Sequence, residues 1–118
     1  MVLVDTSVWV AHFRNGNQDL VELLSNGNVV CHPFIVGELA CGNLSRRAEI
    51  LSLLHALPAA DQAEHEEVLR FIESNRLMGK GVGYIDAHLL ASTVMMGVRL
   101  WTLDRKLRNL TLKLGIGA

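Results

Sequence analysis

The chain has 118 residues, of which 50% are hydrophobic and 19% charged, so it fits one compact domain, 1–118, that buries roughly two-thirds of its unfolded surface. A net charge of −1 gives no overall sign of nucleic-acid binding, and two cysteines are too few for a secreted disulfide framework. No apolar stretch reaches the roughly 20 residues of a membrane span and the start lacks a basic segment, so we expect a cytoplasmic protein with no membrane partner.

Strand and helix patterns alternate in the first half of the chain. Asp5 or Thr6 is placed to cap the first helix, and Asn26-Gly27 is a turn signal that closes the second. Pro33 favours the first position of a third helix. The expected elements are a buried strand at 2–4, a helix at about 6–13, a helix around 20–24, a strand at 28–32, and helices at about 33–44 and 46–55.

The second half continues the alternation. Asp61 and Glu64 are spaced as a capping box for a long helix, and Gly97 stops a later helix that is apolar nearly all round and therefore buried. The expected elements are a weak strand at 56–60, helices at about 61–78 and 84–96, a strand at 98–102, a helix at 104–110 and a weak strand at 111–114. This order predicts a three-layer α/β/α domain with a central, mainly parallel sheet of four to five strands, and we expect Cys31 and Cys41 to be buried thiols.

Four of the 12 acidic residues lie in apolar sequence. Asp5 is the only charged residue in 1–11, Glu38 is the only one in 33–44, and Asp86, in the first turn of the buried helix, is the only one in 81–98 apart from His88. Asp104 ends the apolar strand "LWTLD". A carboxylate in such surroundings is costly unless it is hydrogen-bonded, paired or bound to a metal ion, so each of the four needs an explanation.

Each of these acids also has an ordinary explanation. Asp5 and Asp104 can cap helices, Asp86 can complement the positive end of its helix, and Glu38 can point into solvent. Their position favours a shared role, because the ends of parallel strands and the starts of the following helices converge on one edge of the sheet. Four carboxylates there repel one another, and a hard divalent cation, Mg²⁺ or Mn²⁺, is the simplest way to neutralise them.

Four short motifs lie in order along essentially the whole chain: "VDTS" at 4–7, "GELA" at 37–40, "YIDAHLLAS" at 84–92 and "TLD" at 102–104. Together they resemble the PIN-domain nucleases, in particular the VapC toxins of bacterial toxin-antitoxin pairs. The resemblance implies a Mg²⁺- or Mn²⁺-dependent endoribonuclease that leaves a 5′-phosphate. In that family pattern Asp5, Asp86 and Asp104 hold the metal, and Glu38 orients or deprotonates the attacking water.

The resemblance also implies RNA as substrate, a cognate antitoxin as partner, and a homodimer. The hydroxyls of Thr6, Ser7 and Thr102 can hydrogen-bond the carboxylates or a phosphate, although capping explains the first two equally well. Arg105 and Arg108 share a helical face near the fourth acid and are candidate RNA contacts, although short basic clusters are usually solvated. The sequence departs from the family at His88 and after Asp104, where an acid and a phenylalanine are usual.

Two rival interpretations follow from the same residues. A non-catalytic protein-interaction module of the same fold needs neither a metal ion nor all four acids. An acid-cluster phosphatase of the haloacid-dehalogenase type also places an aspartate after the first strand, but it needs a second aspartate two residues later, where Ser7 stands. Because all four acids are present, we favour the nuclease.

Overall fold

A small parallel sheet forms the centre of the computed structural model, which describes residues 1–118. Its strands, β1 (Val2–Val4), β2 (Val29–Val30) and β3 (Arg99–Trp101), lie in the order β2-β1-β3. Leu3 of the central strand is in register with Val30 on one side and Leu100 on the other. Single bridges, Cys31 with Ala59 and Leu100 with Gly117, continue the pairing beyond both edge strands. The sheet therefore has three strands, with one further parallel contact at each edge.

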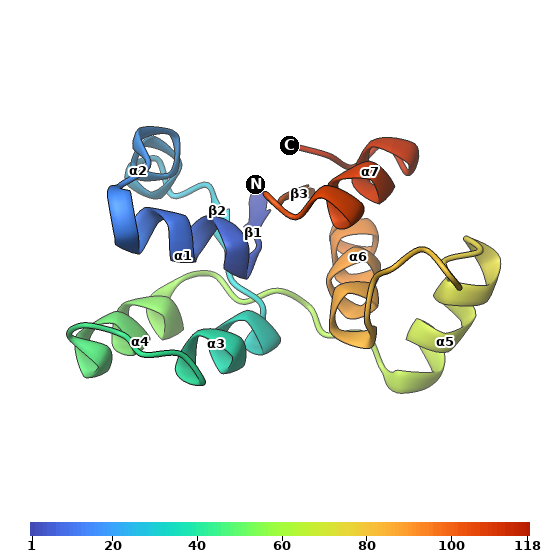
Figure 1. The fold of residues 1–118 in the computed structure, drawn as a ribbon, viewed down its shortest axis with the longest axis horizontal. Coiled ribbons are helices and arrows are strands. Elements are labelled where there is room, and N and C mark those ends of the chain that lie inside the picture. Colours follow the sequence, from blue (N-terminus) through green and yellow to red (C-terminus); the bar gives the residue numbers. More distant parts are fainter.

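Seven helices cover this sheet. In Figure 1 the sheet lies between α1–α4 on one side and α5–α7 on the other, which is the expected three-layer α/β/α arrangement. None of the helices is long and apolar enough to span a membrane. Their bounds are α1 (Thr6–Asn15), α2 (Gln18–Ser25), α3 (Pro33–Ala40), α4 (Arg47–Ala56), α5 (His65–Ser74), α6 (Tyr84–Met96) and α7 (Arg105–Lys113).

Local signals explain where several helices begin and end. The predicted bounds of α6 are confirmed, and Gly97 ends it in the left-handed conformation that glycine adopts at lowest cost. The predicted start of α5 is wrong, because the capping box joins Glu64 to Glu67 and the helix begins after Glu64. The helix also ends before residue 78, since Arg76 adopts a left-handed conformation with φ of 53°.

Other predicted elements differ from the structure near the middle and the end of the chain. The third helix stops at Ala40 rather than 44, and the weak strand at 56–60 is reduced to the bridge at Ala59. The weak strand predicted at 111–114 is wrong. Thr111 lies in α7, where its buried hydroxyl donates a hydrogen bond to the Arg108 carbonyl at 2.7 Å. This back-bond satisfies a β-branched polar residue inside a helix.

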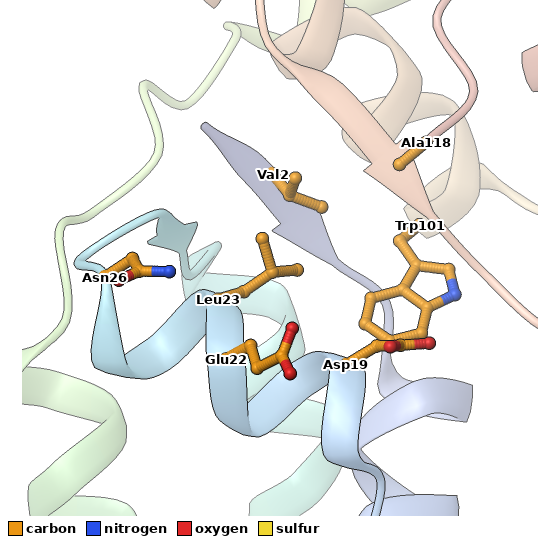
Figure 2. Close-up of a pocket in the computed structure, with 7 residues that line it drawn as sticks. All are labelled: Val2, Asp19, Glu22, Leu23, Asn26, Trp101 and Ala118. Carbon is orange, nitrogen blue, oxygen red and sulfur yellow. The ribbon is translucent and has the colours of Figure 1, made fainter.

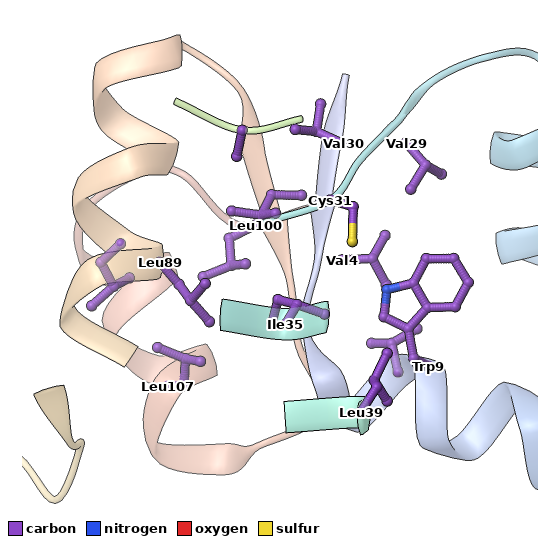
Figure 3. Close-up of a cluster of buried hydrophobic side chains, with 14 of the residues drawn as sticks. Val4, Trp9, Val29, Val30, Cys31, Ile35, Leu39, Leu89, Leu100 and Leu107 are labelled. Carbon is purple, nitrogen blue, oxygen red and sulfur yellow. The ribbon is translucent and has the colours of Figure 1, made fainter. Parts of the chain in front are cut away.

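The main core fills the space between the sheet and both helical layers. Figure 3 shows Ile35 of α3 and Leu89 of α6 close to strand residues such as Leu100. Leu3, which is fully buried, belongs to the same cluster of 18 buried apolar residues. Burying apolar surface is the main stabilising term in a domain of this size, so the core fixes how the helices carrying Glu38 and Asp86 lie against the strands.

The two cysteines have different environments. Cys31 is buried at the end of β2, where burial raises its thiol pKa to about 11 and keeps it protonated. Cys41 follows the last turn of α3 and is exposed, so the expectation that both thiols are buried holds only for Cys31.

Candidate active site

The carboxyl ends of the strands bring two of the four acids to one edge of the sheet. Asp5 comes directly after β1, and its backbone N–H extends the ladder by donating to the Trp101 carbonyl at 2.9 Å. Thr102 and Asp104 follow β3, which is the neighbour of β1. Parallel strands end on the same side, so the order of the elements alone places Asp5 beside the segment 102–104.

The carboxylate of Asp5 is held by two hydroxyl groups and not by a lysine or arginine side chain. Its side chain is only 6% exposed, and its Oδ2 accepts hydrogen bonds from Ser7 Oγ at 2.7 Å and Thr102 Oγ1 at 2.8 Å. The same hydroxyls accept backbone N–H groups, Ser7 from Leu103 at 2.9 Å and Thr102 from Asp104 at 3.0 Å. This network fixes the carboxylate from the strand β3 side. Its second oxygen, Oδ1, makes no hydrogen bond and is not fully buried, so it is available to a ligand.

The predicted capping role holds for one of the two aspartates. Asp104 caps α7, because its Oδ1 accepts the Leu107 N–H at 2.9 Å. Asp5 precedes α1 but its side chain makes no capping bond. Capping therefore accounts for one oxygen of Asp104 and does not account for Asp5.

Glu38 lies in the second turn of α3 and reaches toward the start of α1. Its Oε1 accepts a hydrogen bond from Thr6 Oγ1 at 2.9 Å. Glu38 and Asp104 are both exposed, so the expectation of four acids in apolar surroundings is wrong for these two. It holds for the buried Asp5 and for Asp86, which is half-buried.

Asp86 connects the four acids electrostatically. Partial burial raises the pKa of its carboxyl, and the negative charges of Asp5, Asp104 and Glu38 raise it further. A long hydrogen bond from the Gly83 N–H, 3.4 Å from Oδ2, acts in the opposite direction. No positive charge contributes to the shift. The other three carboxylates are thus close enough to Asp86 to destabilise its charge, without a protein cation to offset them.

A divalent cation fits the chemistry of this group of acids. No three acidic, histidine or cysteine side chains approach one another closely enough to hold an ion by themselves. Mg²⁺ is commonly bound through one or two carboxylates, with waters and substrate phosphates completing its shell. The free Oδ1 of Asp5 and the negative charges that raise the pKa of Asp86 fit such a sparse site.

Neutralising Asp86 should stabilise the metal-free protein. The Asp86→Asn variant keeps an oxygen that can accept the Gly83 N–H but removes a charge whose pKa is raised by burial and three neighbouring acids. We expect its melting temperature in EDTA to rise by a few degrees, and we expect Mg²⁺ to raise the melting temperature of the wild type but not that of the variant. Asp61→Asn, the same change at an exposed acid outside the site, is the control. A lower melting temperature of Asp86→Asn in EDTA contradicts the repulsion.

A row of aromatic rings ties α3 to α6, the helices that carry Glu38 and Asp86. Phe34 and Tyr84 approach the buried ring of His88 edge-on, with centre distances of 4.8 and 4.6 Å. His32, at the start of α3, continues the row, 5.1 Å from Phe34. Its Nδ1 accepts the Phe34 N–H at 3.0 Å, so an imidazole serves as the cap of this helix. His88, where the sequence departs from the family pattern, therefore packs between helices.

Two surface pockets differ in their relation to the acids. One, of about 490 Å³, lies over α2 and includes none of the four; Figure 2 shows the residues that line it, among them Asp19 of α2 and Trp101 of β3. The other, of about 570 Å³, includes Glu38 together with Arg14 and Arg46. Arg14 was not among the predicted site residues; it lies two turns after Thr6 in α1, and both residues line this pocket.

Comparison with known proteins agrees with the geometry. Residues 2–112 match the family model described as "PIN domain". The chain is 43% identical over 117 residues to Ribonuclease VapC32 of Mycobacterium tuberculosis, in two strains of that organism, covering 98% of this chain and 94% of the relative. The crystal structure of PAE2754 from Pyrobaculum aerophilum has the same fold, with a TM-score of 0.65, 16% identity, and coverage of 97% of this chain and 94% of that one. The chain therefore belongs to the PIN-domain family and, within it, to the VapC-type ribonucleases.

Proposed function

We propose that this protein is a Mg²⁺- or Mn²⁺-dependent endoribonuclease that hydrolyses RNA phosphodiester bonds as the toxin of a toxin-antitoxin pair. The observation that carries the proposal is the buried Asp5 carboxylate, fixed by Ser7 and Thr102 at the edge of the sheet where Asp104 also lies, with its Oδ1 free. The charges of Asp5, Asp104 and Glu38, which raise the pKa of Asp86, support it. Membership of a ribonuclease family supplies the substrate class. The proposal assigns Asp5, Asp86 and Asp104 to the cation and Glu38 to the attacking water.

Each side chain then has a defined task. Glu38, exposed and held by Thr6, accepts a proton from the water that attacks phosphorus. Asp5 is fixed through Ser7 and Thr102, so its free oxygen keeps one orientation during the reaction. The bound cation would supply charge neutralisation at the phosphate and leaving oxygens and lower the pKa of water. The products are a 5′-phosphate and a 3′-hydroxyl.

The basic side chains of α7 are proposed to contact the RNA. Arg105 and Arg108 are exposed on the helix that Asp104 caps, and they are spaced to share one face. Contacts between arginine and phosphate release counterions, so the affinity for RNA should fall steeply with salt. Because RNA and its cleavage belong to the cytoplasm, we propose that location for the protein.

The toxin assignment includes a cognate antitoxin and a homodimer. A pocket of about 400 Å³ between α1, α2 and α4 has eight hydrophobic residues among its nine, and Leu53 at its edge is 61% exposed. Exposed apolar surface of this kind supports association with another chain. The measurements are co-purification with the protein encoded next to it and the mass of the isolated chain by light scattering.

The test of this function is RNA cleavage by purified protein with Mg²⁺, with Mn²⁺, and with EDTA. We expect internal cleavage with either metal, no cleavage in EDTA, recovery when metal is restored in excess, and product ends that bear 5′-phosphate. A folded protein that binds no divalent ion and leaves a broad panel of RNAs intact would instead support the non-catalytic interaction module. Release of phosphate from small phosphate esters without RNA cleavage would favour the acid-cluster phosphatase.

A further inference from the structure

The pocket beside Glu38 adjoins the candidate active site. It lies between α1 and α3 and the segment that leads from α3 into α4. Thr6 and Glu38, joined by a 2.9 Å hydrogen bond, line it on the side of the acids. Its volume of about 570 Å³ falls within the roughly 300–1,000 Å³ of sites for small ligands. RNA whose phosphate lies at the four acids would therefore place a neighbouring nucleotide in this pocket.

Two arginines give the pocket an excess of positive charge. Arg14 comes from the last turn of α1 and Arg46 precedes the first turn of α4, and both are exposed. The arginine side chains that donate hydrogen bonds within the protein are Arg47 and Arg99, so the guanidinium groups of Arg14 and Arg46 are free for a ligand. Paired guanidinium groups are well suited to the oxygens of a phosphate.

The other residues that line the pocket are suited to binding a nucleobase. Asn43 and Ser45 offer amide and hydroxyl groups that make no hydrogen bond within the protein. Phe13, 36% exposed, stacks on Trp9 with a centre distance of 5.9 Å, which fixes the orientation of its ring. Single-stranded RNA is recognised by hydrogen bonds to base edges and by stacking on such rings.

The backbone at Arg46 is strained. Its φ of 52° and ψ of 46° lie in the left-handed region, which disfavours any residue with a Cβ. Glycine would adopt this conformation at lower cost. The neighbouring Arg47 does not explain why an arginine occupies position 46, because the Arg47 side chain makes a different contact: it donates to the Gly42 carbonyl at 3.2 Å. Arg76 has the same backbone conformation outside the pocket, so Arg46 is assigned to the subsite by its place in the pocket lining.

We infer that this pocket is a nucleotide subsite for single-stranded RNA next to the bond that is cut. Arg14 and Arg46 bind a phosphate of the flanking nucleotide, and Asn43 and Ser45 contact its base. The inference rests on the proposed function for its substrate, and it assigns part of the sequence preference to the segment between α3 and α4.

The chain offers a matched pair of variants for the test. Arg46 and Arg76 are the only non-glycine residues with positive φ, 52° and 53°, and both are exposed arginines. Arg76 follows α5, on the other side of the sheet from α4 (Figure 1). Replacing either by glycine removes one charge and relieves the same strain, so neither variant should melt at a lower temperature than the wild type.

The measurement is the anisotropy of a fluorescent single-stranded RNA of mixed sequence, titrated with each protein in EDTA so that cleavage does not interfere. We expect Arg46→Gly and Arg14→Gln to bind about tenfold more weakly than wild type, as expected for loss of a charge-assisted contact. Arg76→Gly should stay within about twofold of wild type. The slope of log affinity against log salt should fall by about 0.7 for the pocket variants alone.

Two failures can be told apart. If wild type binds no RNA in EDTA and cuts none with Mg²⁺ or Mn²⁺, the subsite and the proposed function fall together; if it cuts RNA with metal but binds none in EDTA, the subsite alone is overturned. If wild type binds RNA and Arg46→Gly matches Arg76→Gly, the subsite is overturned while the nuclease assignment stands. Unchanged RNA binding together with weaker binding of the protein partner would assign the pocket to that partner and also overturn the inference.

Discussion

Replacing Asp5 by asparagine should reduce RNA cleavage by at least about a thousandfold while leaving the fold intact. Asp5 is the buried acid of the site, and its Oδ1 is the carboxylate oxygen left free by the hydroxyls of Ser7 and Thr102. A neutral amide cannot replace the charge at a cation site, and loss of metal-supplied stabilisation at a phosphate costs several kcal/mol of the barrier. The measurement is single-turnover cleavage with saturating Mg²⁺.

The fold should survive because asparagine keeps an oxygen that can accept both hydroxyl hydrogen bonds. The backbone of Asp5, which pairs with Trp101 and begins α1, is unaffected by the change. Asp61→Asn, the same substitution at an exposed acid, should cleave at the wild-type rate and controls for a general effect of lost charge. Wild-type activity in Asp5→Asn would remove this residue from the site, and unfolding of the variant would make its role structural.

Stability should fall steeply as the pH drops from about 6.5 toward 4, because of His32. This side chain is fully buried, and burial, reinforced by the charge of His88, lowers its pKa from 6.5 to about 4. Its Nδ1 also accepts the Phe34 N–H, which a protonated Nδ1 cannot do. Between pH 6.5 and about 4, the unfolded chain binds a proton at the His32 imidazole that the folded protein does not bind. The contribution of neutral His32 to the free energy of unfolding is therefore complete above pH 6.5 and lost by about pH 4. The loss is at most about 3 kcal/mol.

The His32→Asn variant isolates this contribution. Asparagine is a good N-cap and can accept the Phe34 N–H, but it does not titrate and leaves a cavity, so the variant should be less stable by about 1–3 kcal/mol at neutral pH. Denaturant unfolding at several pH values should show the gap between the two proteins narrowing as the pH falls. The acids and His88 titrate in both proteins and largely cancel in the difference. A gap that stays constant from pH 7 to 4 contradicts the role given to His32.

Much of the site could be predicted because it depends on strand order. A short apolar strand that ends in Asp5, and another that leads to Asp104, had to meet at one edge once both were placed in a parallel sheet. The bounds of the helix that carries Asp86 could also be predicted, since its apolar sequence ends at Gly97. The surroundings of Glu38 could not be predicted, because α3 is apolar on most sides and its pattern does not reveal which face reaches solvent.

The remaining differences arise where local signals compete. Asp61 and Glu64 have the spacing of a capping box, but so do Glu64 and Glu67, and the structure forms the second pair. Thr111 favours a strand by propensity and is nevertheless accommodated in a helix. Arg14 fell outside the first predicted helix, which ends two residues later than the pattern indicated. Its place in the pocket beside Glu38 depends on that additional length.

The measurement that tests the central claim most directly is a calorimetric titration of Mn²⁺ into the wild-type protein and the Asp5→Asn variant. The site of Asp5, Asp86 and Asp104 should bind the ion in the wild type with saturation and a defined stoichiometry, and the variant should bind it far more weakly while melting cooperatively. Absence of saturable binding in folded wild type, or equal binding by both proteins, would contradict a metal site at Asp5, Asp86 and Asp104.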